Sequence, residues 1–523
     1  MTAIDGAILA AYLSVVLAIG LRLSRRMRTG ADLFLAGRSL PWWAIGLSLV
    51  VSDIGAKDIV GLAQDGYRHG WVMANWDWLG CIPAMVLAAI VFVPYFWAGG
   101  FYTVPEYFGK RYNEGVRAIA TVVWVLFIAG NVGVIFSAAT GTIASFLGLE
   151  GYETWVLVGS AIFVGIYTSS GGLAAVVYTD AIQCVVMILG LAVVLARGLA
   201  HPSVGGWEAF ASSIAAEHPD HLKLFHPAEN PSSFTTFSVV FGLAVVMGPA
   251  YWIGNQVIVQ RTLGARSLRD ARAGTLFGAL VKLAFPLLLV LPGILALRVI
   301  PFRLEGEATR RVFPELVKSL LPTGLSGLVL AAMVAGFMGN LDSYLNSAAT
   351  LFTRDLVRRY VVRGPSDPLA SGRLDLWLGR ALTAAILTFG AVLSTQIHHI
   401  FETMQWMLAN FQGSFLALLL FGMFSRRATG TGGLAGIVVG LGAAVFLNWE
   451  KDRLFGHRAP GGDWVPYANP YLHIAWWSFA AACVAIAAAS FLTRPHPAGR
   501  LEGLVFGTRR GAGSELSDAR QAL

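Results

Sequence analysis

The sequence predicts an all-α polytopic membrane protein with about thirteen transmembrane helices. The 523 residues are 56% hydrophobic but only 13% charged, whereas soluble domains average about 25% charged residues. The mean hydropathy is +0.64, and the apolar residues fall in repeated runs of about 20, the length that crosses the hydrocarbon core of a bilayer. A chain with so few charges for its surface is expected to lie in lipid.

Each expected span is an apolar run bounded by polar, Gly or Pro residues. The first run is followed by Arg22, Arg25 and Arg26, whereas a cleaved signal peptide carries its positive charge before the apolar region. We therefore expect this run to be retained as a span. In chain order, the spans are expected at residues 4–24, 41–68, 74–98, 117–147, 154–169, 176–198, 232–260, 271–300, 323–352, 374–394, 398–424, 431–447 and 471–492.

Basic residues gather in alternate loops, which is the charge bias of membrane insertion. This distribution accounts for the net charge of +8, so we expect the lipid bilayer, and no nucleic acid, as a partner. The bias predicts a plasma (inner) membrane protein with its N-terminus outside and its C-terminus in the cytoplasm. The expected cytoplasmic loops contain Arg25, Arg26, Arg28, Arg38, Lys110, Arg111, Arg261, Arg266, Arg269, Arg272, Arg354, Arg358, Arg359, Arg363, Arg426 and Arg427.

Two of the expected spans are interrupted by polar, Gly and Pro residues. The first interruption is Ser52–Asp58 and the second is Gly248–Gln256. The second interrupted span is the fifth after the first, which is the offset of an inverted five-plus-five helix repeat with broken first and sixth core helices. Unwound backbone is tolerated at membrane depth where it lines a cavity, although Gly248-Pro249 alone would also suit a simple kink.

The repeats predict the domain organisation. We expect one extra helix before them, and two helices and a tail after them. In order, the segments are 1–40 (extra helix and cytoplasmic loop), 41–198 (first repeat), 199–231 (outer loop), 232–424 (second repeat), 425–493 (two C-terminal helices) and 494–523 (cytoplasmic tail).

Three ionisable residues, Asp53, Lys57 and Asp58, fall within the first interruption. Each is costly at the centre of a bilayer and typically marks a substrate or ion pathway. Their clustering within six positions therefore indicates a secondary transporter.

Other polar residues within the expected spans are also open to structural explanations. Asp77 would suit an interfacial aromatic belt, and Lys282 would suit a side chain that reaches the inner interface. Gln405 would suit a hydrogen bond between helices, and Asp180 a helix cap. The small and amide residues of 339–347 would suit close helix packing.

Several segments of the chain match sequence motifs of a known protein family. They occur in the same order and with similar spacing, from about residue 30 to residue 425. They are Asp32–Arg38, Ser52–Gly55, Val60–Ala63, Tyr102–Tyr107, Tyr167–Asp180, Asn255–Leu263, Leu345–Ser347 and Leu351–Asp355. With these segments the chain resembles the solute:sodium symporter family and, within it, the sodium/glucose cotransporters. The resemblance implies a fold of two inverted five-helix repeats.

The resemblance also implies a sugar site formed by side chains of several helices. Carboxylate, amide and ammonium groups hydrogen-bond the hydroxyls of a polyol, and aromatic rings cover the apolar face of a sugar. Two positions depart from the family's pattern, because Asp53 stands where the family usually has Asn and Asp58 where it has an amide or imidazole. With these two included, the expected substrate-binding residues are Asp53, Asp58, Asp77, Tyr251, Trp252, Asn255, Lys282 and Gln405.

The sodium site that the resemblance implies departs further from the pattern. The family uses backbone carbonyls at positions that resemble Val51 and Ile54, together with two hydroxyl residues of the eighth core helix. Those two positions look like Gly339 and Asn340, with a third contact at Gly336. Sodium prefers oxygen ligands, and glycine offers no side-chain oxygen.

Lys57 stands one turn after Asp53, where the family usually has a small or polar residue. Its ammonium group would take the charge position of the ion by pairing with Asp53, Asp58 or Asp180, the last of which we also assign to the ion site. We therefore expect sodium coupling to be weakened or lost, and we expect no cofactor. A lysine buried among acids would alternatively couple transport to protons, because burial and neighbouring charges shift its pKa.

These observations predict a secondary transporter of a sugar or sugar-like polyol that works by alternating access. The alternatives are a sodium-independent facilitator, a proton-coupled symporter, and a transporter of amino acids or cationic solutes. A transporter-like sensor would normally carry a signalling domain, and a channel would need a ring of like charges. We expect no enzyme, because neither an HExxH nor a GxSxG motif is present.

Overall fold

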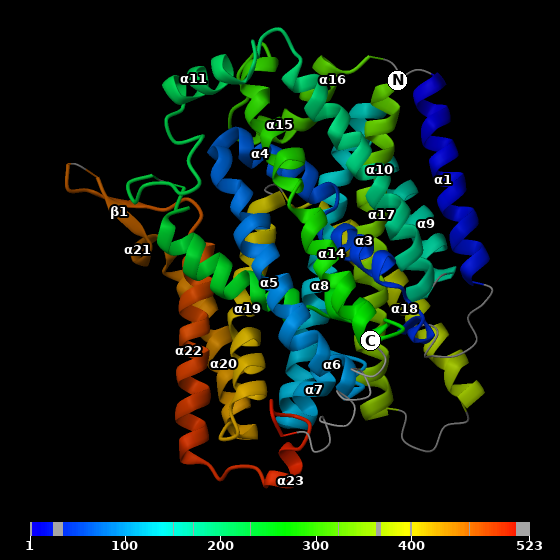
Figure 1. The fold of residues 1–523 in the computed structure, drawn as a ribbon, viewed down its shortest axis with the longest axis vertical. Coiled ribbons are helices and arrows are strands. Elements are labelled where there is room, and N and C mark those ends of the chain that lie inside the picture. The colour runs from blue at the N-terminus through cyan, green and yellow to red at the C-terminus, as the bar shows by residue number, and fades with distance from the viewer. Residues whose placement is uncertain are drawn as a thin grey trace.

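The computed structural model describes residues 3–24, 35–149, 151–170, 172–230, 232–322, 324–361, 368–397, 400–459 and 461–508. Within these ranges the chain is an elongated bundle of helices with one short β-hairpin. The start of α1, α11 and α16 lie at one end of the bundle, and α23 lies at the opposite end (Figure 1). Part of the expected loop after the first span, 25–34, and the last part of the expected tail, 509–523, fall outside the described residues.

The elements of the first half of the described chain, up to Glu217, are all helices and run from α1 to α11. Its helices begin at capping residues where the sequence supplies them: the Thr103 side chain accepts a hydrogen bond from the Glu106 amide, and Asn113 does the same for Val116. In order, the elements are α1 (Ala3–Ser24), η1 (Ala36–Arg38), α3 (Trp42–Asp53), α4 (Ala56–His69), η2 (Gly70–Ala74), η3 (Trp76–Cys81), α5 (Ile82–Leu87), η4 (Ala88–Phe92), α6 (Val93–Gly99), α7 (Val104–Arg111), α8 (Glu114–Leu147), α9 (Glu153–Ser170), α10 (Leu173–Leu199) and α11 (Trp207–Glu217).

The second half continues with helices and the hairpin. The strands β1 and β2 pair antiparallel, with His457 opposite Val465. In order, the elements are η5 (Ser238–Met247), α12 (Gly248–Gly254), α13 (Gln256–Leu263), α14 (Leu268–Lys282), α15 (Phe285–Val299), η6 (Gly306–Arg311), α16 (Val312–Leu320), α17 (Leu325–Leu351), η7 (Phe352–Val361), α18 (Pro368–Ser394), α19 (Ile400–Phe424), α20 (Gly430–Trp449), α21 (Lys451–Leu454), β1 (Gly456–Arg458), β2 (Trp464–Pro466), α22 (Tyr471–Leu492) and α23 (Ala498–Leu501).

The first predicted interruption is present between α3 and α4. Ile54 and Gly55 have extended backbone, with φ and ψ of −93° and 115° at Ile54 and −132° and −166° at Gly55. The freed amide of Gly55 donates to Asp58 Oδ2 at 2.9 Å, which caps α4. A Cβ at Gly55 would lie 2.7 Å from Cγ of Asn340. Glycine therefore lets α17 approach the break.

The second predicted interruption is also present, between α12 and α13. Asn255 is extended (φ −74°, ψ 120°), and its side chain accepts a hydrogen bond from the Val257 amide at 2.9 Å. The helix axis bends by 48° here. Pro249 lies in the first turn of α12, where its missing N–H costs little. The bend therefore centres on Asn255 and not on the proline.

The described residues contain nine helices that are long and apolar enough to cross a membrane, or ten if the bent pair of Ser238–Gly254 and Gln256–Leu263 counts as one span. This result confirms an all-α polytopic membrane protein. Three shorter apolar helices, Ala3–Ile19, Trp42–Asp53 and Glu153–Gly165, overlap the remaining expected spans, and the number thirteen stays a prediction.

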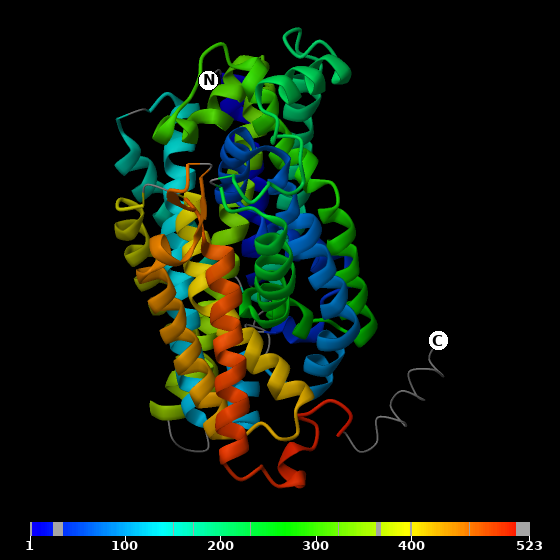
Figure 2. The same cartoon turned by 90° about the vertical axis from the view of Figure 1, so that its left-hand side faces the viewer.

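Small residues let α14 pack closely along α3. A Cβ at Gly46 would lie 2.6 Å from the Phe277 ring and 2.8 Å from the carbonyl oxygen of Gly274. This packing aligns the C-terminal ends of the two helices, Asp53 on α3 and Lys282 on α14. On another side of the bundle α22 packs on α19 and α20, and it faces the viewer in Figure 2.

Candidate functional site

A cavity lies beside the first helix break and beside α12, the helix that precedes the second break. It holds about 660 Å³ of atom-free space, counting its opening. Residues of α3, α4, η3, α8, η5, α12, α17 and α19 line it. They are Asp53, Ile54, Lys57, Asp58, Leu62, Trp76, Asp77, Gly80, Cys81, Phe127, Asn131, Leu243, Met247, Gly248, Tyr251, Trp252, Tyr344, Met404, Leu408 and Gln412.

Three charged side chains meet at the edge of this cavity. Lys282 Nζ lies 2.5 Å from Asp53 Oδ2 and 2.5 Å from Asp77 Oδ1. The lysine side chain is fully buried, whereas the side chains of Asp53 and Asp77 are 17% and 6% exposed. Lys282 therefore contacts two acids within the bundle instead of reaching the membrane interface. We call Asp53, Lys282 and Asp77 the triad.

A second ion pair lies at the start of α4. Lys57 Nζ donates to both carboxylate oxygens of Asp58, at 2.9 and 2.7 Å, and to the backbone oxygen of Asp53 at 3.3 Å. Asp58 also accepts from the Gly55 amide. Of the three partners expected for Lys57, the structure therefore gives Asp58 as its carboxylate partner.

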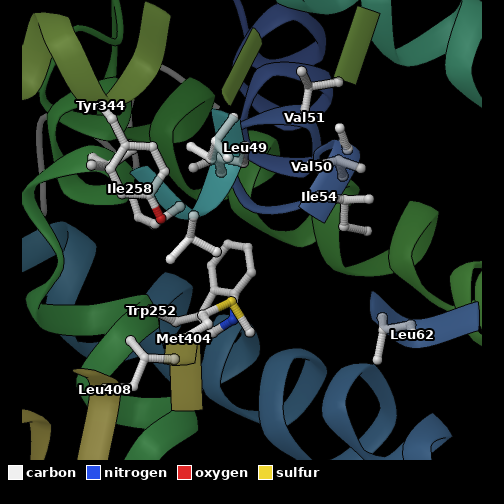
Figure 3. Close-up of a cluster of buried hydrophobic side chains, with 14 of the residues drawn as sticks. Leu49, Val50, Val51, Ile54, Leu62, Trp252, Ile258, Tyr344, Met404 and Leu408 are labelled. Atoms are coloured by element: carbon white, nitrogen blue, oxygen red, sulfur yellow. The ribbon is translucent and has the colours of Figure 1, made fainter. Parts of the chain in front are cut away.

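Aromatic side chains form one wall of the cavity. The hydroxyl groups of Tyr251 and Tyr344 share a hydrogen bond of 3.3 Å, and the Lys282 ammonium lies 5.6 Å from the centre of the Trp252 ring. Figure 3 shows Trp252 beside Met404, with Leu62 across from them. These rings supply the broad apolar face that the sequence predicts for a sugar.

Three of the predicted residues, Asn255, Lys282 and Gln405, do not line the cavity. Lys282 contacts Asp53 and Asp77, which do line it. Asn255 caps α13, and Gln405 is buried without a hydrogen-bond partner among the described residues. Two residues that sequence reasoning missed, Asn131 and Gln412, line it instead. The sequence feature that could have identified them is an amide side chain within an otherwise apolar span. The same feature led to the prediction of Gln405.

The Asn131 and Gln412 side chains are each 1% exposed. Asn131 donates to the Phe127 carbonyl oxygen at 3.1 Å, but its Oδ1 has no partner, and neither polar atom of the Gln412 amide has one among the described residues. Buried polar groups are normally hydrogen-bonded. Two unpaired amides at one cavity therefore suit a polar ligand.

At the position expected for the ion, the Asn340 side chain fills the gap between α17 and α3. Its Nδ2 donates to the carbonyl oxygens of Val51 and Ser52, at 3.0 and 3.2 Å. A Cβ at Gly339 would overlap Cγ1 of Val51 and lie 2.6 Å from Oε1 of Gln183. A hydroxyl side chain therefore has no room at residue 339.

The other positions expected at the ion site also surround the first break. Ile54 lies in the extended segment, and its amide still donates to the Val50 carbonyl at 2.8 Å. A Cβ at Gly336 would lie 3.3 Å from the backbone of Gly55. The tight packing of α17 against the break thus depends on glycine at residue 336 of α17 and at residue 55 of the break.

Asp180 pairs with Arg261 and not with Lys57. Arg261 Nη2 lies 3.3 Å from Asp180 Oδ2, and both side chains are essentially inaccessible. Arg261 also donates to Ser48 Oγ at 2.7 Å and to the hydroxyl of Ser343, while Ser48 donates to Asp180 at 2.6 Å. The negative charge expected at the ion site therefore has a cationic partner in the protein.

Asp53, Asp77 and Cys81 lie close enough together to hold a metal ion, with ligand atoms within 4.8 Å of one another. The Lys282 ammonium contacts both carboxylates. A metal ion in the same place would meet a positive charge. The residues of this cluster therefore fit the lysine better than a metal.

The chain matches the profile of the sodium:solute symporter family over residues 33–440. It is 31% identical to a sodium/glucose cotransporter of Vibrio parahaemolyticus, over 85% of each chain. It is 32% identical to sodium/myo-inositol cotransporter 2 of Mus musculus, over 84% of this chain and 68% of the relative. A solved structure of a Na+-coupled sialic acid symporter superposes with a TM-score of 0.77 at 20% identity, over 94% of this chain and 99% of the other, which shows a shared fold. The chain therefore belongs to the sodium:solute symporter family, whose members are secondary transporters and not enzymes.

Proposed function

We propose that the protein carries a sugar or sugar-like polyol across the membrane by alternating access. The observation that carries this proposal is the cavity between the two helix breaks, where carboxylate, ammonium and unpaired amide groups lie beside aromatic rings. Such a mixture suits a ligand with several hydroxyl groups and one apolar face. The names of the relatives, cotransporters of glucose and of myo-inositol, agree with this class of solute.

The broken helices support two inverted repeats, 41–198 and 232–424, that move relative to each other. Each repeat contains one break, α3–α4 in the first and α12–α13 in the second. Breaks at corresponding positions of the two repeats are where transporters of this architecture place their sites. The cavity is lined by Asp53 and Ile54 at the first break and by residues of α12, the helix that precedes the second break, so a movement of one repeat against the other would change access to it.

Transport by this chain is proposed to run without sodium. At the expected ion position Asn340 Nδ2 presents N–H groups to the carbonyl oxygens of Val51 and Ser52. The guanidinium of Arg261 partners Asp180. A sodium ion needs oxygen ligands with available lone pairs, and these interactions occupy three of the nearby oxygens.

Proton coupling is the second candidate. The Lys57–Asp58 pair at the start of α4 is buried, and a buried lysine beside an acid changes its protonation state when its surroundings change. A movement that separates α4 from the break would expose the pair to water. Transport would then follow the proton gradient, and Lys57→Met would abolish this dependence.

Uptake into proteoliposomes tests both parts of the proposal. The purified chain is reconstituted, and uptake of radiolabelled glucose, myo-inositol and mannose is followed with a sodium gradient, with choline in its place, and with a pH gradient. The proposal expects saturable uptake of at least one of these solutes in choline medium, and loss of that uptake in Lys282→Gln. Uptake that rises steeply with the sodium gradient and is unaffected by Lys57→Met would overturn sodium independence.

The membrane orientation is proposed to place the N-terminus and the segment with α11 outside. The start of α1, α11 and α16 share one end of the bundle in Figure 1, and α23 lies at the other. That arrangement agrees with the charge bias of the loops. A membrane-impermeant thiol reagent should label Ser203→Cys, and not Ser425→Cys, in intact cells.

A further inference from the structure

The charges around the cavity do not cancel. Lys57 and Asp58 form a neutral pair, whereas Lys282 faces two acids, Asp53 and Asp77. With all five groups ionised, the described residues at the cavity therefore carry one unit of net negative charge. A buried charge without a counter-charge is costly, and a ligand of opposite charge would remove that cost.

Asp53 is the acid best placed to receive such a ligand. Its side chain is the most exposed of the triad, and it lines the cavity. Asp53 is also the last residue of α3, where the partial negative charge of the helix C-terminus adds to that of the carboxylate. The contacts of the carboxylate among the described residues are with the Lys282 ammonium and, at 3.9 Å, the Cys81 thiol, and both use Oδ2.

The other polar and aromatic groups of the cavity indicate which further chemical groups the ligand carries. The unpaired amide atoms of Asn131 and Gln412 are buried and line the same space, and they would pair with hydroxyl groups. Tyr251 and Trp252 offer ring faces, which attract cations as well as the apolar face of a sugar. A ligand with one cationic group and several hydroxyl groups would satisfy all of these features.

We propose that the preferred solute carries a protonated primary amine beside its hydroxyl groups, as an amino sugar does, with the ammonium group bound to the Asp53 carboxylate. This proposal rests on the proposed function and specifies its substrate class. The ammonium would give Asp53 a second cation beside Lys282, so that two carboxylates and two ammonium groups balance in the site. Binding is non-covalent, and no covalent bond is formed or broken.

Paired solutes that differ in a single group test this proposal. Binding of glucosamine, glucose and N-acetylglucosamine to the purified full-length chain in nanodiscs is measured by titration calorimetry at about pH 6.5, below the usual pKa of an amine. Glucosamine should bind at least about tenfold more tightly than glucose, and acetylation of the amine should remove this advantage. Asp53→Asn should bring the affinities for glucosamine and glucose to within about twofold.

Controls separate the possible failures. Asp452→Asn makes the same chemical change at an exposed residue of α21 and should leave the preference intact. If Asp53→Asn does not fold, Asp77→Asn removes the same unit of charge from the triad and should also reduce the preference. Equal or tighter binding of glucose by the unaltered chain would overturn the amine proposal while leaving polyol transport standing. If none of the three sugars binds or is exchanged, the proposed function itself fails.

Discussion

Asn340 on α17 donates its side-chain amide to the backbone carbonyl of Val51 on α3, at 3.0 Å, one turn before the chain unwinds. A second hydrogen bond from the same nitrogen reaches the carbonyl of Ser52. The amide thus joins α17 to α3 at the place where this family would bind an ion according to the resemblance. A permanent neutral bridge there would hold the broken helix in place without a charged ligand.

Replacement of Asn340 by Ala should destabilise the protein by about 1–3 kcal/mol, because two buried carbonyl oxygens lose their donor. Thermal unfolding in detergent measures the effect, and Gln396→Ala, at an exposed position, serves as the control. Sodium should leave the melting temperature of the unaltered chain unchanged. A large stabilisation of the unaltered chain by sodium, and not by choline, would contradict the assignment of this bridge.

Gly339→Ser should impair folding, because its Cβ would overlap the side chain of Val51 and crowd that of Gln183. Overpacking of a buried position typically costs about 1–3 kcal/mol. The double variant Gly339→Ser/Val51→Ala removes the overlapping methyl groups and should recover much of the yield of folded protein. Size-exclusion chromatography and melting curves provide the readout. A single variant as stable as the unaltered chain would show that the helices separate easily here.

Lys282→Gln should be among the most damaging substitutions beside the cavity. The change leaves Asp53 and Asp77 without their shared cation, and loss of one partner of a buried ion pair costs about 3–5 kcal/mol. Asp77→Asn in the same chain should restore part of the stability, because one repelling carboxylate is gone. A double-mutant cycle of melting free energies measures the coupling. Additive effects of the two changes would contradict the triad.

Asn131→Ala should weaken binding of the transported sugar about tenfold, equivalent to about 1.4 kcal/mol, with little loss of stability. Asn131 Oδ1 has no partner among the described residues, so the substitution removes a hydrogen bond that the ligand would make. The folded protein loses only the hydrogen bond from Asn131 to the Phe127 carbonyl oxygen. Titration calorimetry and melting curves of the same preparation distinguish the two effects. An equal loss of binding and stability would indicate a purely structural amide.

Acidification should loosen the connection between 199–235 and α4. His226 shares a hydrogen bond with Ser232 through Nδ1, at 2.7 Å, and donates from Nε2 to the His69 carbonyl oxygen, at 3.0 Å. Burial lowers the pKa of His226, although the hydrogen bond to His69 acts in the opposite direction. Because the pKa in the folded state lies below the ordinary value of about 6.5, this contribution to stability is complete above that value and decreases as the pH falls below it.

Melting temperatures between about pH 8 and pH 5 test the role of His226. His226→Gln keeps a donor for the carbonyl but has no titrating ring, so its melting temperature should depend less on pH than that of the unaltered chain. His201→Gln, in the same segment but half-buried, is the matched control. Identical pH profiles for the unaltered chain and His226→Gln would contradict the role assigned to this histidine.

Much of the fold could be predicted from the sequence because lipid imposes strong patterns. The apolar runs and the polar residues at 52–58 and 248–256 predict the spans and both breaks, and the structure has the breaks between Asp53 and Ala56 and at Asn255. Their positions follow from local chemistry, because glycine and polar residues weaken a helix wherever the helix lies.

The contacts between distant helices could not be predicted in the same way. The contact of Lys282 with both Asp53 and Asp77 depends on how α14 packs along α3, and a sequence does not display that register. Asn131 and Gln412 resemble many other amides in apolar spans, and only the three-dimensional arrangement brings them to the cavity. Gln405 is the opposite case: it is an amide in an apolar span, but it does not line the cavity.

Arg261 links four helices through a single guanidinium group. It lies on α13 and hydrogen-bonds Ser48 of α3, Asp180 of α10 and Ser343 of α17. If α3 and α13 tilt away from α10 and α17 during a transport cycle, some of these bonds must break in every turnover and form again afterwards. The activation energy of solute-free reorientation would then depend on this one side chain, and Arg261 would set how fast the empty carrier returns.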